Sequence, residues 1–216
     1  MTKAVIFDLD GTLLNTLGDL TAAVNHGLAT CGLPIHTEAQ VRTYVGDGVK
    51  ELIARACPAD ADAATRAAVE AAYLPYYAAH NRVFTAPYAG VMPLLNELYQ
   101  RGVKLAVVSN KHDSGVQALC AHYFGGLLDL ALGGGDVRPL KPAPDSVLYA
   151  MERLGVTPAE TWYVGDSTID VVTARNAGLR CAAVTWGFHD RDRLVAERPA
   201  ALADTAEELQ NVLLSG

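Results

Sequence analysis

The chain has 216 residues, of which half are hydrophobic, and a formal net charge of −7 at pH 7. Such a length fits one large domain, or one domain with a smaller insert, around a real hydrophobic core. The acidic balance and the scarcity of Lys and Arg runs argue against a nucleic-acid partner and a membrane surface, because both require clustered positive charge. We expect a small-molecule partner instead.

Cysteine usage and the N-terminus point to the cytoplasm. The chain begins with a short strand and lacks the features of a signal peptide, and no run reaches the roughly 18 apolar residues that a membrane helix needs. The cysteines are widely spaced without a Cys-x-x-Cys pair, so we expect reduced packing residues. They are Cys31, Cys57, Cys120 and Cys181. The oligomeric state, monomer or dimer, stays open.

The first predicted element is a buried strand that ends in two carboxylates. Residues Ala4 to Phe7 are all apolar, as in strands covered on both faces of a parallel sheet. Asp8 and Asp10 follow at i and i+2, so they project from the same side of an extended chain, and Gly11 allows a sharp turn. Two like charges held close in an apolar setting require a proton or a cation. The alternative is a strand followed by an ordinary polar turn.

Residues 15–82 are predicted to form a compact helical insert that contains no strand. Apolar residues recur there at helical spacing, and Thr37 followed by Gln40 is typical of a capping box. The four helices are expected at about residues 17–31, 37–45, 49–57 and 59–80.

Beyond the insert, strands and helices alternate. Strands are expected at residues 103–108, 128–132, 161–164 and 181–185, and helices at 90–101, 113–124, 144–154, 169–177 and 206–214. This alternation indicates an α/β fold, a Rossmann-like open parallel sheet with helices on both faces. Ligands of such sheets bind at the carboxyl ends of the strands.

Polar side chains accumulate at these strand ends. They are Asp8 and Asp10 after the first strand, Ser109 and Asn110 after the second, Lys141 in a proline-rich loop after the third, Asp166 after the fourth, and Asp170 one helical turn further. Four carboxylates and one lysine that face one small volume cannot all be ionised without a cation. Their hard oxygen ligands favour Mg²⁺.

Four segments together resemble the signature of the haloacid dehalogenase superfamily, in its branch with a helical cap. They are Asp8-Leu9-Asp10-Gly11-Thr12, Ser109-Asn110-Lys111, Lys141-Pro142-Ala143-Pro144-Asp145 and Gly165-Asp166-Ser167-Thr168-Ile169-Asp170. The resemblance implies an α/β core of residues 1–14 and 83–216, with residues 15–82 as a mobile cap.

The resemblance also implies how the acidic residues act. Asp8 would attack phosphorus and become an aspartyl-phosphate. Mg²⁺ would be bound by the Asp8 carboxylate, the Asp10 backbone carbonyl and Asp166. Asp170 would orient the waters of the metal or, as the alternative, bind the metal directly. Asp10 would protonate the leaving oxygen and later accept a proton from water. A dehalogenase needs no such proton donor, so Asp10 favours phosphoryl transfer.

The remaining residues would bind and neutralise the phosphoryl group. Lys141 would add a fixed positive charge beside Asp8, and Thr12 and Ser109 would donate hydrogen bonds to the phosphoryl oxygens, with Asn110 beside them. In the insert, Gly46 and Gly48 precede a helix start, and their N–H groups could bind an anionic part of the substrate. The alternative for these glycines is an ordinary turn between helices.

The substrate is the finer question. Segments such as Val45-Gly46-Asp47-Gly48-Val49 and Pro87-Tyr88-Ala89-Gly90-Val91 resemble the phosphoglycolate phosphatases. We therefore expect a Mg²⁺-dependent phosphatase that acts on a small phosphomonoester. Two alternatives stay open: a sugar-phosphate phosphomutase, and a non-catalytic binding protein that retains the fold.

Overall fold

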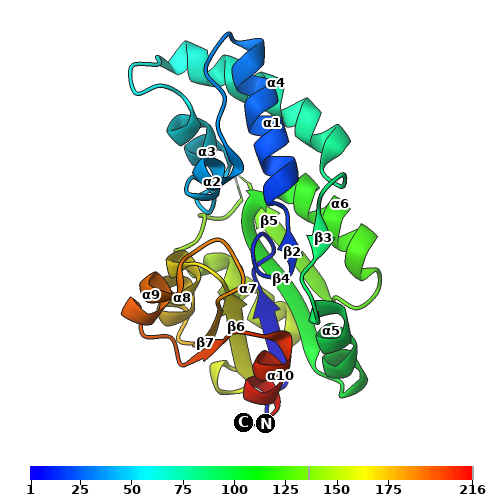
Figure 1. Cartoon of the computed structure of the whole chain (residues 1–216). Coiled ribbons are helices and arrows are strands. Elements are labelled where there is room, and N and C mark those ends of the chain that lie inside the picture. Colours follow the sequence, from blue (N-terminus) through cyan, green and yellow to red (C-terminus); the bar gives the residue numbers. More distant parts are fainter. Residues whose placement is uncertain (136, 216) are drawn as a thin grey trace. The chain divides into compact units, whose positions relative to one another are not determined.

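A computed structural model describes residues 1–135 and 137–215. The chain forms two compact units, and each is drawn in Figure 1. The first, Met1–Leu14 with Pro87–Gly216, is the α/β unit, and the second, Asn15–Ala86, is the helical unit. None of the helices in the described part of the chain is long and apolar enough to span a membrane.

The α/β unit is built on a six-stranded parallel sheet in the order β5-β4-β1-β6-β7-β8. Its strands are β1 (Ala4–Phe7), β4 (Lys104–His112), β5 (Leu130–Gly134), β6 (Thr161–Gly165), β7 (Arg180–Val184) and β8 (Ala201–Ala203). From β1 the chain adds β4 and β5 on one side and later β6, β7 and β8 on the other. The order therefore reverses at β1, and ligands of open parallel sheets bind at such a switch point. The predicted α/β fold class is confirmed.

Helices cover both faces of this sheet, as the sequence predicts. They are α5 (Val91–Gln100), α6 (Asp113–Phe124), α7 (Asp145–Leu154), α8 (Thr168–Asn176), α9 (Arg191–Ala196) and α10 (Ala206–Leu214), with a 3₁₀ turn, η1, at Pro158–Glu160. Side chains of β1 alternate between two cores: Val5 and Phe7 pack with α5, α6 and α10, and Ile6 packs with α7, α8 and α9. Burial on both faces explains why β1 has no polar residue before Asp8.

The helical unit consists of α1 (Leu17–Thr30), α2 (Glu38–Arg42), α3 (Val49–Ala56) and α4 (Ala63–His80). The capping box predicted at Thr37 and Gln40 is present at the start of α2. α4 begins four residues later than predicted, because the Asp62 carboxylate accepts a hydrogen bond from Thr65 N and caps the helix there.

The helical unit runs to Ala86 rather than ending at residue 82. Asp19, buried on α1, explains the longer extent: its carboxylate accepts hydrogen bonds from Phe84 N (3.0 Å), Thr85 N (2.9 Å) and Thr85 Oγ1 (2.7 Å). Two short strands, β2 (Leu14–Asn15) and β3 (Ala86–Pro87), pair where the chain leaves and returns to the α/β unit. The expectation that the insert contains no strand was therefore wrong at Asn15.

Several features of the α/β unit differ from the sequence prediction. The second strand continues through Ser109, Asn110 and Lys111 to His112, because β4 resumes pairing with β5 at Gly134 after a register shift. η1, α9 and β8 were not predicted. The four cysteines are free thiols, and three of them are buried, as expected for packing residues.

Candidate active site

The site lies at the carboxyl ends of three adjacent strands, β4, β1 and β6. Asp8 follows β1 directly, Asp166 follows β6, and Asp170 lies in the first turn of α8. Carboxylate oxygens of these three buried residues all lie within 4.8 Å of one another. Parallel pairing of β1 with β6 brings Asp8 close to Asp166, because Phe7 stands in register with Val164.

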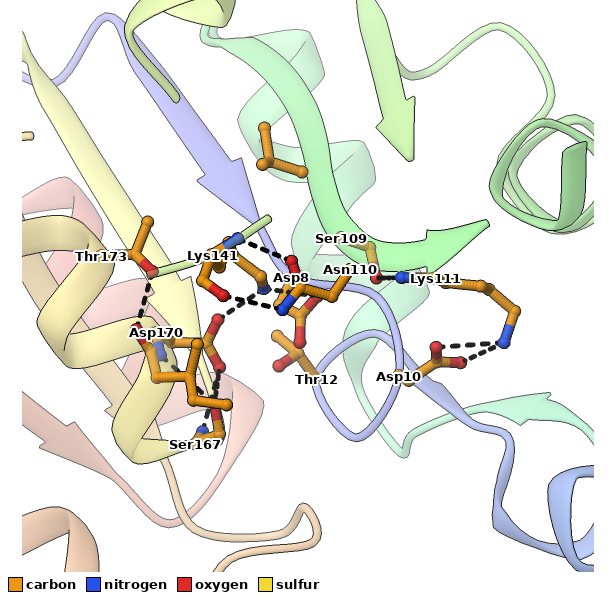
Figure 2. A network of polar contacts seen from close by, with 12 residues as sticks. Asp8, Asp10, Thr12, Ser109, Asn110, Lys111, Lys141, Ser167, Asp170 and Thr173 are labelled. Atoms are coloured by element: carbon orange, nitrogen blue, oxygen red, sulfur yellow. Dashed lines mark hydrogen bonds and ion pairs between the residues drawn. The ribbon is translucent and has the colours of Figure 1, made fainter. Parts of the chain in front are cut away.

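Asp8 and Lys141 form the centre of the site (Figure 2). Asp8 is 8% exposed, and Lys141 Nζ lies 2.9 Å from its Oδ1. Burial raises the pKa of the Asp8 carboxyl to about 6, although the Lys141 charge opposes the shift. Burial alone would lower the pKa of Lys141, but the carboxylates of Asp170 and Asp8 raise it well above its usual range. Lys141 therefore remains a fixed positive charge.

Asp170 and Tyr163 fix the position of the Lys141 ammonium through hydrogen bonds. Lys141 Nζ donates to Asp170 Oδ1 at 2.7 Å and to the Tyr163 hydroxyl at 3.1 Å. The other carboxylate oxygen of Asp170 accepts from Ser167 N at 3.0 Å and from Ser167 Oγ at 2.6 Å, which completes a capping box at the start of α8. Both Asp170 oxygens are thus engaged within the protein, consistent with a positioning role.

Asp166 is held in a close-fitting cradle. Thr12 Oγ1 donates to its Oδ1 at 2.8 Å, and Phe188 N donates to its Oδ2 at 2.7 Å. A Cβ at Gly11 or at Gly187 would lie 2.3 Å from atoms of the Asp166 side chain, so glycine is required at both places. Burial, with the charges of Asp170 and Asp8, raises the pKa of Asp166 well above its usual range.

Asp10 points away from Asp8 and Asp170 and toward Lys111 (Figure 2). Lys111 Nζ donates to both Asp10 carboxylate oxygens at 3.0 Å. The two side chains are only 7% and 12% exposed. Four predicted site carboxylates therefore face two lysines in the structure rather than one.

The polar residues of β4 also have defined places. The Asn110 side chain bonds the main chain of Lys141 in both directions, accepting from Lys141 N at 2.7 Å and donating to Lys141 O at 3.1 Å. Ser109 Oγ is buried and accepts from Lys111 N at 3.3 Å. Asn110, expected to contact substrate, thus fixes the loop that presents the lysine.

The two glycines expected to bind an anion, Gly46 and Gly48, lie in the helical unit. Both adopt positive φ, 131° and 86°, in the turn before α3. Arg55 holds this turn, since it donates to Tyr44 O at 3.0 Å and pairs with Asp47 at 2.5 Å. The role of these glycines stays a prediction.

Four contributors to the site were not among the predicted residues: Lys111, Tyr163, Ser167 and Phe188. Ser167 could have been found as the first residue of a Ser-x-x-Asp capping pattern. Lys111 directly follows Ser109 and Asn110, which were predicted to belong to the site. Only its contact with Asp10 distinguishes it from a surface lysine. Phe188 acts through its backbone N–H, and Tyr163 lies in a buried strand. No pattern in the sequence therefore identifies either residue as part of the site.

The residues present fit a hard divalent cation. Asp8 Oδ1 is buried and lies 2.9 Å from the Lys141 ammonium, and carboxylate oxygens of Asp166 and Asp170 lie close by. Burial opposes ionisation of both Asp8 and Asp166, so a cation between them would stabilise the charged forms. The donor set consists of carboxylate oxygens, which suit Mg²⁺ better than softer metals.

Comparisons with known proteins agree with this geometry. The model of a family described as haloacid dehalogenase-like hydrolase matches residues 5–184. Phosphoglycolate phosphatase 1 of Pseudomonas aeruginosa is 35% identical over 214 residues, covering 97% of this chain and 79% of that protein. The phosphoglycolate phosphatase of Vibrio vulnificus is 34% identical over 220 residues, covering 98% and 96%. A solved structure of a Lactobacillus delbrueckii subsp. bulgaricus protein, 35% identical, matches all of both chains with a TM-score of 0.95.

Proposed function

The chain belongs to the haloacid dehalogenase-like hydrolase family, and from this premise we propose that it is a phosphoric monoester hydrolase. Phosphoglycolate is the first candidate substrate, because that is the substrate named for relatives 34–35% identical to this chain. The observation that carries the proposal is the buried Asp8 carboxylate, which pairs with Lys141 and has oxygens of two further carboxylates within 4.8 Å.

Asp8 is the nucleophile in this proposal. One carboxylate oxygen forms a bond to phosphorus while the bond between phosphorus and the leaving oxygen breaks, which gives an aspartyl-phosphate. Water then attacks this phosphorus, inorganic phosphate leaves, and Asp8 is regenerated. Lys141 cannot serve as the nucleophile, because the Asp8 and Asp170 carboxylates keep its ammonium charged.

Asp10 handles the proton in both steps. It donates a proton to the leaving oxygen in the first step and accepts one from the attacking water in the second. We assign the Asp10 carboxyl, two residues after Asp8, to the side of phosphorus from which the leaving oxygen departs. Lys111 fixes its orientation through the two contacts of 3.0 Å.

Mg²⁺ bound by the carboxylates of Asp8 and Asp166 and the Asp10 backbone carbonyl would offset the repulsion between an anionic nucleophile and a phosphate dianion. Thr12 and Phe188 N hold Asp166 in place for that task. Lys141 stabilises the charge of Asp8, and Asp170 and Tyr163 keep Lys141 there. Ser109 is assigned to donate its hydroxyl proton to a phosphoryl oxygen.

We assign the helical unit the role of a cap that sorts substrates and excludes water. Its main support is its position in the chain: it is inserted between Leu14 and Pro87, directly after the segment that carries Asp8, Asp10 and Thr12.

The test is phosphate release from a panel of esters that includes phosphoglycolate and a hexose 1-phosphate, with Mg²⁺ and with EDTA. The proposal predicts Mg²⁺-dependent release of inorganic phosphate, with phosphoglycolate among the best substrates. Conversion of the hexose phosphate to an isomer without phosphate release would instead identify a phosphomutase. Binding of esters without turnover of any of them would contradict an enzymatic role.

A further inference from the structure

The ion pair of Lys111 with Asp10 lies beside the reacting centre, and the proposed chemistry uses Lys111 only to orient Asp10. Its Nζ contacts both oxygens of Asp10 at equal distances of 3.0 Å. We propose that Lys111 determines substrate specificity by binding a carboxylate on the leaving part of the substrate. This inference rests on the proposed function, since it assumes that Asp10 protonates the leaving oxygen.

Geometry places the Lys111 ammonium against the leaving group. A proton donor must come within hydrogen-bond distance of the leaving oxygen, and Lys111 Nζ is one hydrogen-bond length from that same donor. The atoms joined to the leaving oxygen therefore lie within reach of Lys111. Lys141, in contrast, lies between Asp8 and Asp170, on the side of the nucleophile.

Burial of the Lys111 side chain strengthens the attraction between its charge and an anion. The pair is almost fully buried, and the Asp10 and Lys111 charges both act on the thiol of Cys120, which belongs to the hydrophobic core. A charge in such a poorly hydrated place attracts an anion far more strongly than one in water. Buried ion pairs add little to stability relative to packed apolar side chains, so a role in binding is a better reason for this one.

The surrounding structure is shaped to present this lysine. Lys111 still belongs to β4, and its main chain is fixed by the hydrogen bond from its N–H to Ser109 Oγ. Its side chain passes Gly115 on α6, where a Cβ would lie 3.4 Å from Lys111 Cε. The aliphatic part of the side chain is therefore confined, and the ammonium loses little freedom when it binds an anion.

The charge of Lys111 favours a substrate with an anionic leaving group. When Asp10 carries the proton that it donates to the leaving oxygen, its carboxyl no longer neutralises the Lys111 ammonium. A leaving group with a carboxylate can share the Lys111 ammonium with Asp10, since an ammonium has three N–H donors. A neutral leaving group gains nothing from Lys111, so the structure predicts selection for phosphorylated hydroxy acids over phosphorylated alcohols.

The experiment compares kcat/KM for phosphoglycolate with kcat/KM for ethyl phosphate, which lacks the carboxylate, in the wild type and in Lys111→Met. We expect the wild type to prefer phosphoglycolate and the variant to lose roughly ten- to a hundred-fold of that preference, the range for a charge-assisted hydrogen bond. The ratio is the readout, because loss of the Asp10 partner lowers both rates together.

Three further variants sharpen the result. Lys111→Arg keeps the charge and should retain most of the preference. Lys111→Gln removes the charge and should lose the preference, so it replaces Lys111→Met if that variant does not fold. Lys104→Met is the matched control, because Lys104 is an exposed residue of the same strand that pairs with Asp129, and its ratio should equal that of the wild type.

The failures can be told apart. If no ester is hydrolysed in the presence of Mg²⁺, the proposed function fails and this inference falls with it. If esters are hydrolysed but the wild type shows no preference for phosphoglycolate over ethyl phosphate, the inference alone is overturned. An unchanged ratio in Lys111→Met would overturn it equally.

Discussion

Lys141 Nζ lies 2.9 Å from Asp8 Oδ1, and the lysine side chain is only 4% exposed. In the absence of a bound cation, Lys141 is therefore the charge that holds Asp8 and Asp170 together. Lys141→Met should lower the free energy of unfolding in EDTA by about 3–5 kcal/mol, since it leaves buried carboxylates unpaired. Chemical denaturation measures this.

Mg²⁺ should restore part of the stability of Lys141→Met, because a cation can replace the missing charge. The control Lys104→Met removes a lysine that pairs with Asp129 at the surface and should cost no more than about 1 kcal/mol. Equal losses in the two variants would show that Lys141 does not hold the carboxylates together.

A second prediction concerns pH. Burial raises the folded-state pKa of Asp8 from 3.8 to about 6. Between these two values the folded protein binds more protons than the unfolded chain, so the Asp8 contribution to stability is present below pH 4 and is lost as pH rises through 6. The lost contribution is on the order of 3 kcal/mol.

This pH effect can be isolated by comparison with Asp8→Asn in EDTA. The free energy of unfolding of the wild type minus that of the variant should fall between pH 4 and pH 7, since the variant cannot ionise. Addition of Mg²⁺ should flatten the difference, because a cation favours the carboxylate. A difference that rises over this range would contradict the burial argument.

A third prediction tests the cradle of Asp166. A Cβ at Gly187 would lie 2.3 Å from Asp166 Cβ and Oδ2, so Gly187→Ala must displace this carboxylate. We expect the Mg²⁺ concentration for half-maximal activity to rise by roughly 10- to 100-fold, the usual effect of disturbing groups that orient a ligand. Gly135→Ala is the control, because a Cβ there meets nothing within 4 Å among the residues that the structure describes. Equal Mg²⁺ requirements would count against Asp166 as a ligand.

A fourth prediction concerns the segment that leads from the helical unit back to the α/β unit. Asp19 accepts three hydrogen bonds from Phe84 and Thr85 while only 2% exposed. Asp19→Ala leaves two backbone N–H groups unsatisfied and should cost about 2–3 kcal/mol of unfolding free energy. Limited proteolysis should then cleave near residues 83–86. Asp60→Ala, at an exposed position, should leave both measurements unchanged.

Much of the fold could be predicted from sequence because the periods are strong. α6 and α10 have the predicted bounds, and the apolar strand before Asp8 is β1 as expected. Elements whose formation depends on distant partners were missed or misplaced. β8 (Ala201–Ala203) is too short to show a period and exists because it pairs with β7, and the longer β4 follows from its pairing with β5.

For the candidate site, the sequence predicts which residues take part but not which groups they contact. Asp8, Asp166, Asp170 and Lys141 could be selected because they follow strands and because the segments around them form a family signature. The orientation of side chains could not be predicted. Thr12 donates to Asp166, and Asn110 bonds the Lys141 backbone, because the folded chain brings these groups into contact from segments that are far apart in the sequence.

The central claim is that Asp8 carries the phosphoryl group during turnover. Its direct test is rapid acid quench of the protein with Mg²⁺ and phosphoglycolate, followed by borohydride reduction and mass spectrometry of the peptide that contains Asp8. The account predicts that Asp8 is recovered as homoserine, the reduction product of an aspartyl-phosphate, and that Asp145→Asn, at the exposed start of α7, gives the same result. Full hydrolytic activity in Asp8→Asn, or a phosphoryl group trapped on another residue, would contradict it.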